Sequence, residues 1–207
     1  MEIYSIQPNS WRSNCYILIN EDENGRHGAV VDPSVPANEI ISFVSGKDAR
    51  LEMIILTHGH FDHVLSVDTL REQLNIPLYI HEKDAELLLD GEKNAYTLFF
   101  GKDMVYKPAD RLLCDDGIVN LGSEQIKIFS TPGHTPGSIC LLCPDFILTG
   151  DTLFADGYGR YDLYGGCREQ LKDSLGSLRS LNRELTIYPG HGREELLGNA
   201  LDNIHYL

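Results

Sequence analysis

Apolar residues along the chain follow two patterns. In short runs they alternate with polar residues or are continuous, and in longer segments they recur every three to four residues. The first kind predicts β-strands, and the second predicts helices with one buried face. Strands are expected at 2–6, 14–20, 28–33, 51–56, 76–81, 126–130, 138–143, 145–150 and 185–189. Helices are expected at 36–47, 64–74, 82–90, 171–181 and 197–204. The pair Asn24-Gly25 predicts a hairpin between the second and third strands.

Residues 90–122 have the weakest periodicity, and we expect them to form a loop-rich insert over one face. Elsewhere the strands end in polar clusters and the helices lie between them, which predicts a layered α/β fold. The chain has 207 residues, of which 42% are hydrophobic. That is enough for one core, so we expect a single domain over residues 1–207.

The formal net charge of -14 argues against a nucleic acid or an anionic membrane surface as partner, because both attract basic patches. No apolar run approaches the ~20 residues that a membrane helix needs. Residues 1–11 lack the basic and apolar regions of an export signal. Five cysteines, an odd number, then predict free thiols in a cytoplasmic protein. Cys140 and Cys143 lie three apart on one predicted strand, so we expect them on opposite faces and buried.

One loop concentrates residues that bind metals. Thr57-His58-Gly59-His60-Phe61-Asp62-His63 directly follows the predicted strand 51–56 and precedes a helix. Four potential ligands therefore lie between a strand and a helix, where α/β proteins place their sites. They are His58, His60, Asp62 and His63.

Three further candidates follow other predicted strands. They are His134 in TPGHTPGS, Asp151 in LTGDTLF and His191 in YPGHG. Each follows a glycine, which allows a sharp turn. Seven imidazole and carboxylate groups would repel one another or stay unsatisfied unless a cation gathered them. This donor set suits zinc, iron or manganese.

H-x-H-x-D-H, followed by a later His, a later Asp and a final His, resembles the metallo-β-lactamase superfamily from VVDP to PGHG. The segment GDTLFADGYGRYDLYGG is similar to the glyoxalase II-like branch. The resemblance implies a four-layer αββα sandwich with its site between two sheets. It also implies two divalent cations, zinc first and iron or manganese as alternatives.

Matched position by position, the resemblance assigns a role to each candidate. His58, His60 and His134 would hold one cation, and Asp62, His63 and His191 the other. Asp151 would bridge the two, so that Asp62 and Asp151 belong to the catalytic centre.

Four positions outside the ligand set are also compared with the family. Asp32, in VVDP, would support the ligand loop, although by itself it reads as a turn residue. Arg160 and Tyr161 occupy the place where glyoxalase II enzymes contact substrate, and a structural Arg160–Asp162 ion pair is the alternative. Cys167 stands where relatives often have Ser, and we expect no cap from it for the helix that follows.

The resemblance implies hydrolysis of a small thioester of the S-lactoylglutathione type. Two neighbouring cations lower the pKa of a shared water and polarise the carbonyl, and a thiolate leaves without a strong general acid because its pKa is near ~8.5. The chain ends sixteen residues after His191, so the C-terminal region that binds glutathione in the longer enzymes is expected to be missing. The alternatives are a mononuclear iron persulfide dioxygenase and a lactonase of the same fold.

Overall fold

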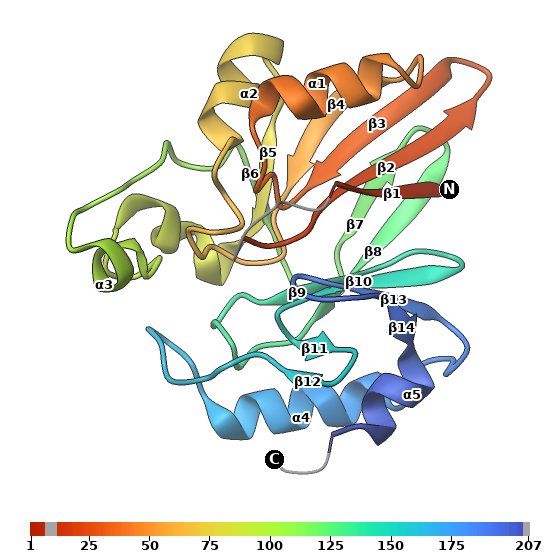
Figure 1. Cartoon of the computed structure of the whole chain (residues 1–207). Coiled ribbons are helices and arrows are strands. Elements are labelled where there is room, and N and C mark those ends of the chain that lie inside the picture. The colour runs from red at the N-terminus through yellow and green to blue at the C-terminus, as the bar shows by residue number, and fades with distance from the viewer. Residues whose placement is uncertain (7–11, 205–207) are drawn as a thin grey trace.

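A computed structural model describes residues 1–6 and 12–204, and its two β-sheets pack face to face with helices on both outer sides (Figure 1). Residues 1–11, in which the sequence analysis found no export signal, lie partly outside the described ranges. The first sheet has the order β1-β2-β3-β4-β5-β6. Its strands are β1 (Glu2–Ile6), β2 (Cys15–Asp22), β3 (Gly25–Val31), β4 (Arg50–Ile55), β5 (Leu78–His81) and β6 (Arg111–Leu113).

The second sheet has the order β14-β13-β10-β9-β8-β7, and β11 and β12 form a separate ribbon. The strands are β7 (Ile118–Leu121), β8 (Glu124–Ser130), β9 (Ile139–Leu142), β10 (Phe146–Gly150), β11 (Leu153–Phe154), β12 (Gly157–Tyr158), β13 (Thr186–Pro189) and β14 (Glu195–Leu196). The helices are α1 (Ala37–Ser45), α2 (Val67–Leu74), the 3₁₀ helix η1 (Glu82–Leu89), α3 (Tyr96–Phe100), α4 (Arg168–Leu178) and α5 (Leu197–Asp202). Figure 1 shows α1 and α2 over the first sheet and α4 and α5 under the second. This is the αββα sandwich that the resemblance implied.

Three apolar clusters fill the spaces between these four layers. Strand β2 contributes to two of them, because successive side chains of a strand point to opposite faces. Cys15, Ile17 and Ile19 pack towards α1 and α2, while Tyr16 and Leu18 pack against the second sheet. The third cluster joins the second sheet to α4 and α5. Strands buried on both faces explain the continuous apolar runs in the sequence.

Cys140 in β9 and Cys143, which directly follows this strand, show the same division. Cys140 packs in the cluster beneath the second sheet, and Cys143 packs in the cluster between the sheets. Burial raises the pKa of each thiol to about 12. The prediction that these thiols are buried on opposite faces is therefore confirmed. All five cysteines are free.

The segment 90–122 differs from the prediction of a loop-rich insert. Residues 111–113 form β6 at the edge of the first sheet, and residues 118–121 form β7 at the edge of the second. In β6, Arg111 and Leu112 are exposed and Leu113 is buried. In β7, Ile118 and Asn120 are exposed, while Val119 and Leu121 are buried. Both strands are short and expose apolar side chains, Leu112 in β6 and Ile118 in β7, so no clear alternation stands out in the sequence. The insert is therefore confined to the part that contains α3.

Helix boundaries differ from prediction by a few residues, as they do where packing decides the last turn. Helix α2 begins at Val67 rather than at Val64, and α4 ends at Leu178, so that Leu181 lies beyond it. The predicted helix at 82–90 is the 3₁₀ helix η1. The hairpin at Asn24-Gly25 is confirmed, with Asp22 paired to Gly25. Within the described ranges, no helix is long and apolar enough to cross a membrane.

Candidate metal centre

The seven predicted ligands lie together where the ends of four strands meet. The loop from His58 to His63 follows β4 of the first sheet. His134, Asp151 and His191 follow β8, β10 and β13 of the second sheet. Residues separated by more than a hundred positions therefore share one edge of the sandwich.

Glycines allow these loops to approach one another closely. Gly133 precedes His134 with a φ of 135°, a conformation that L side chains rarely adopt, and a Cβ there would overlap the backbone of Leu171. A Cβ on Gly190 would overlap the carboxylate of Asp151. The turns beside the ligands thus require residues without a side chain.

His58, His60 and His134 form the first group of converging ligand atoms. Nε2 of His134 lies 2.9 Å from Nδ1 of His60 and 3.2 Å from Nε2 of His58. A tetrahedral ion with ligand nitrogens at ~2.0–2.1 Å separates them by about 3.3 Å. The three nitrogens are therefore spaced as ligands of one ion, and all three side chains are buried.

Hydrogen bonds on the far side of the rings fix which nitrogen faces the group. Nδ1 of His134 lies 2.6 Å from the carbonyl oxygen of Arg160, which can only accept, so Nδ1 carries the proton. The Thr57 hydroxyl donates to Asp32 at 2.7 Å and can accept from Nδ1 of His58 at 3.1 Å. Nε2 of both histidines is then left with a lone pair, as metal binding requires.

Asp62, His63 and His191 form a second group beside the first. Oδ2 of Asp62 lies 3.2 Å from Nε2 of His191 and 3.9 Å from Nε2 of His63. His63 is fully buried, whereas the side chain of His191 is 32% exposed. The second group is therefore the one open to solvent.

Asp151 lies between the two groups. Its Oδ1 is 3.5 Å from Nε2 of His63, and its Oδ2 is 3.6 Å from the Nε2 atoms of both His134 and His191. Burial acts to raise the pKa of this carboxyl, but the imidazole of His63 and then those of His134 and His191 hold it below its ordinary value. Asp151 is therefore ionised and faces both groups.

The donors fit metal ions better than they fit one another. Nε2 of His63 and Oδ1 of Asp151 are buried without a hydrogen-bond partner, and each faces the cluster. Burial and the neighbouring imidazoles lower the pKa of His58 well below its ordinary value and that of His60 to about 3. Neutral imidazoles at His58 and His60 beside ionised carboxylates are the ligand state that divalent cations need. At His63 burial acts to lower the pKa, but the surrounding carboxylates raise it well above its ordinary value.

Asp32 forms hydrogen bonds to the loop that carries the first four candidate ligands. Its carboxylate accepts hydrogen bonds from the backbone N–H of Thr57 at 2.8 Å, from the Thr57 hydroxyl and from Nδ1 of His63 at 2.9 Å. The residue has a φ of 50°, in the left-handed region that Asp tolerates better than most residues. It therefore orients His63 directly and His58 through Thr57.

Two supporting residues were missed by the sequence analysis. Asp84 in η1 is fully buried and accepts from the backbone N–H groups of Gly59 and Gly137 at 3.0 and 2.6 Å. Asn14 donates to the carbonyl oxygens of Pro189 and Gly192, on either side of His191. A buried Asp inside an acidic helical segment and an Asn before a strand carry no periodic signal of their own.

A cavity of about 520 Å³ opens onto the metal-binding groups. Its polar lining includes His60, Asp62, His134, Asp151 and His191. Its other walls are Phe61, Ala95, Phe99, Phe100, Phe154, Gly159, Arg160 and Leu163.

The predicted substrate residues differ in their surroundings. Arg160 lines the cavity, and its guanidinium forms two hydrogen bonds to Asp162, at 2.7 and 2.9 Å. Tyr161 is half-buried and packs against the apolar cluster beneath the second sheet. Cys167 precedes α4 and makes no side-chain cap. A substrate contact by Arg160 or Tyr161 stays a prediction.

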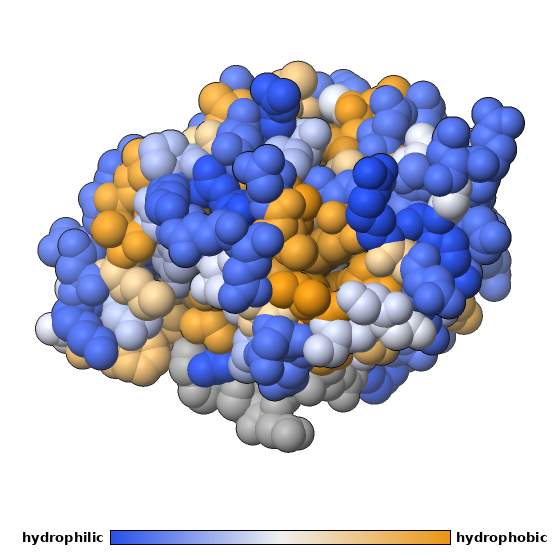
Figure 2. Space-filling view, turned by 90° about the horizontal axis from the view of Figure 1, so that it is seen from above, coloured by the Kyte–Doolittle hydropathy of each residue, from blue (hydrophilic) through white to orange (hydrophobic). Residues whose placement is uncertain are grey.

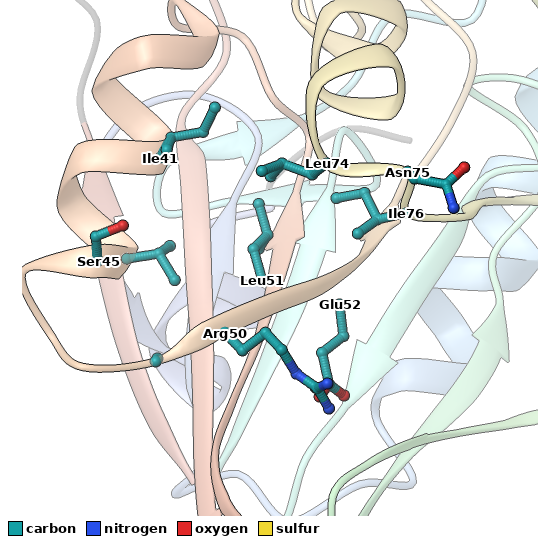
Figure 3. A pocket seen from close by; sticks show the side chains of 10 residues that line it. Ile41, Ser45, Arg50, Leu51, Glu52, Leu74, Asn75 and Ile76 are labelled. Atoms are coloured by element: carbon teal, nitrogen blue, oxygen red, sulfur yellow. The ribbon is translucent and has the colours of Figure 1, made fainter.

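A second hollow, of about 600 Å³, lies at the other end of β4 from the ligand loop. Its walls come from α1, α2 and the start of β4, with Ile41, Leu51, Leu74 and Ile76 turned towards one another (Figure 3). Figure 2 looks onto the face that carries α1 and α2 and shows apolar residues exposed in a hollow among charged ones. This hollow contains no cluster of metal-binding side chains.

Comparisons with known proteins agree with this geometry. The model of the metallo-beta-lactamase superfamily matches residues 9–191. The probable metallo-hydrolase YqgX of Bacillus subtilis is 35% identical over 186 residues, which cover 88% of this chain and 86% of that protein.

Solved structures give the same result. The BLEG-1 B3 metallo-beta-lactamase superposes with a TM-score of 0.89 at 31% identity, covering 97% of each chain. TTHA1623 in a di-iron-bound form superposes with a TM-score of 0.83 at 28% identity, covering 99% of this chain and 100% of that one. On its fold, its cluster of histidines and carboxylates and these matches, the chain belongs to the metallo-β-lactamase superfamily.

Proposed function

We propose that the protein is a dinuclear metal-dependent hydrolase of small thioesters, of the glyoxalase II-like type. The observation that carries the proposal is the pair of adjacent ligand groups, whose donor atoms lie within 4.8 Å of one another in each group. A hydrolase assignment agrees with the probable metallo-hydrolase YqgX, a relative at 35% identity.

In this proposal each group holds one cation. His58, His60 and His134 would bind the first and Asp62, His63 and His191 the second, with Asp151 shared. Zinc is the first choice for this donor set, and iron is the main alternative because the similar TTHA1623 has been seen with two irons. Two such cations supply a nucleophile by lowering the pKa of water and a Lewis acid for the carbonyl.

The side chains of this chain perform the remaining tasks. Asp32 and the carbonyl of Arg160 hold the imidazoles with their lone pairs turned inwards. Asp151 stays ionised and balances the positive charge of the centre. The aromatic side chains of the cavity offer an apolar surface to the substrate beside the candidate ligands. A thiolate leaving group then needs no further acid.

The thioester specificity is supported by the segment that resembles the glyoxalase II-like branch. Phe154, Gly159, Arg160 and Leu163 belong to that segment, and all of them line the cavity. The resemblance therefore falls on residues that a substrate can reach.

Metal content and substrate class test the proposal together. We expect two metal ions per chain after purification in metal-replete medium, because seven donors are too many for one centre. Inductively coupled plasma mass spectrometry measures this number. One iron per chain with full activity would instead support the persulfide dioxygenase.

The same preparation is assayed with S-lactoylglutathione, a lactone and glutathione persulfide. We expect hydrolysis of the thioester with weak saturation, since no cluster of basic residues lines the cavity to bind glutathione. Oxygen consumption with the persulfide and no thioester cleavage would overturn the proposal, and cleavage of the lactone alone would replace it with a lactonase.

A further inference from the structure

Three phenylalanines form an apolar surface beside the metal-binding groups. Phe61 lies in the ligand loop between His60 and Asp62, and its ring centroid is 5.5 Å from those of both Phe99 and Phe100 in α3. All three line the cavity. We call Phe61, Phe99 and Phe100 the aromatic wall. Figure 1 shows α3 standing away from both sheets, so two of the three rings come from the insert and one from the ligand loop.

Buried hydrogen bonds hold α3 in this position. Asn94 is fully buried, and its carbonyl accepts from the N–H of Phe61 at 3.1 Å. Its side chain donates to the carbonyl of Met104 at 2.9 Å and accepts from the N–H of Tyr96 at 2.9 Å. The ligand loop and α3 are therefore joined through one residue, and the wall is fixed relative to the metal-binding groups.

The wall is nevertheless open to solvent. Phe99 is 55% exposed and Phe100 is 44% exposed. Side chains of this size gain little by facing water, and an exposed apolar patch beside a reactive site marks a place where a ligand binds. The position of the wall next to the ligand loop fits a group attached directly to the carbonyl under attack.

Charges in the cavity restrict what that group can be. Arg160 is the one cationic side chain among the cavity residues given above, and Asp162 engages it. Among the side chains of the cavity, a negatively charged substituent meets no unengaged cationic group, whereas an apolar one meets three aromatic rings.

We propose that the aromatic wall binds an apolar acyl group, so that the preferred substrates are thioesters of medium-chain or aryl-substituted carboxylic acids. This inference rests on the proposed function and names the substrate class of the same site. Hydrolysis adds water across the C–S bond and yields the free carboxylic acid and the thiol, so no further reactant is needed.

An acyl series with one neutral thiol measures the preference. The metal-loaded enzyme is assayed with N-acetylcysteamine thioesters from acetyl to octanoyl and with the phenylacetyl thioester. We expect kcat/KM to rise about twofold to fourfold per methylene until the wall is covered, as for burial of a CH₂ group. Values that do not depend on the acyl group would overturn the inference and leave the hydrolase intact.

Two alanine variants on the same helix locate the effect. Phe99→Ala should lower the ratio of kcat/KM for the hexanoyl thioester to that for the acetyl thioester about tenfold. Leu98→Ala is the control, because Leu98 is 67% exposed and lies outside the cavity. An equal effect of both variants, together with a changed sedimentation coefficient, would mean that α3 contacts a second copy of the chain, and the inference would be wrong.

Binding provides a readout that is independent of turnover. Isothermal titration calorimetry of the metal-loaded protein with butanoate, hexanoate and octanoate should give dissociation constants that fall with chain length, and Phe99→Ala should flatten this series. If no thioester is cleaved while this trend holds, the proposed hydrolase fails but the apolar subsite stands. If the trend is absent, the subsite fails.

Discussion

At the scale of single residues, the metal-binding groups depend on carboxylates that never need to touch a substrate. Asp32 accepts three hydrogen bonds from Thr57 and His63 and thereby sets the direction of two imidazoles. Its neutral counterpart Asn would turn an amide N–H₂ towards one of these donors. Mutation of a residue that hydrogen-bonds to a metal ligand lowers metal affinity about tenfold to a hundredfold.

We predict that Asp32→Asn lowers metal affinity by about tenfold to a hundredfold while the protein stays folded. Asn tolerates the left-handed backbone that position 32 requires, so the variant isolates the loss of the carboxylate. Asp48→Asn is a matched control, since Asp48 is exposed and has a φ of 53°. Competition with a chromogenic chelator measures the affinity, and equal affinities for both variants would contradict the prediction.

Asp151 faces both ligand groups, so Asp151→Ala should lose metal and activity together. We expect kcat/KM to fall by more than about a hundredfold, because even partners outside the ligand set change metal binding by that amount. Asp156→Ala is the control, because Asp156 lies in the nearby turn between β11 and β12 and pairs with Arg193 at the surface. Retention of both metals and most of the rate in Asp151→Ala would show that the assignment is wrong.

At the scale of elements, η1 connects two ligand loops that are far apart in the sequence. Its Asp84 accepts from Gly59, between His58 and His60, and from Thr135 and Gly137, which follow His134. Burial raises the pKa of Asp84, and these hydrogen bonds offset part of the shift. The carboxylate therefore fixes the distance between the β4 loop and the β8 loop.

We predict that Asp84→Asn destabilises the protein by about 1–3 kcal/mol, because the amide leaves one buried donor unsatisfied. It should also weaken metal binding, which loss of packing elsewhere would not do. Glu82→Gln, an exposed change in the same helix, should have neither effect. Urea denaturation and metal titration measure the two quantities, and a stability change with unaltered metal affinity would contradict the positioning role.

At the scale of the whole molecule, the edge away from the metal-binding groups contains a pH-sensitive contact. His27 in β3 is buried, and its ring nitrogens lie 2.9 Å from Glu52 and 3.1 Å from Asp22. The hydrogen bonds to Glu52 and then Asp22 raise the pKa of His27. Arg50 also donates a hydrogen bond to Glu52, so this carboxylate keeps a cationic partner when His27 is neutral.

The raised pKa has a defined effect on stability. The folded state holds the proton more tightly, so the stabilisation is complete below the ordinary His pKa of ~6.5 and is lost as the pH rises through the folded value. We predict that His27→Gln lowers the free energy of unfolding by up to about 1 kcal/mol near pH 6, and by less at pH 9. Urea denaturation at both values checks this, and a difference that grows with pH would contradict the assignment.

The sequence by itself determined the layered α/β fold and the seven candidate ligands. Strands buried on both faces leave continuous apolar runs, as in β4, and ligands such as His58 and Asp151 directly follow such runs. These signals are local in the chain, because they depend on the period of side chains along a strand and on glycines at sharp turns.

The tertiary structure alone decided how distant segments meet. The carboxylate of Asp84 lies against Gly137 and the amide of Asn94 against Met104, and no pattern in the sequence predicts either contact. The edge strands β6 and β7 were missed, because each is only three or four residues long and exposes apolar side chains, so that no clear alternation marks it. The aromatic wall arises because α3 packs on the ligand loop, and its ring contacts join residues from separate segments whose local sequences do not determine their distance.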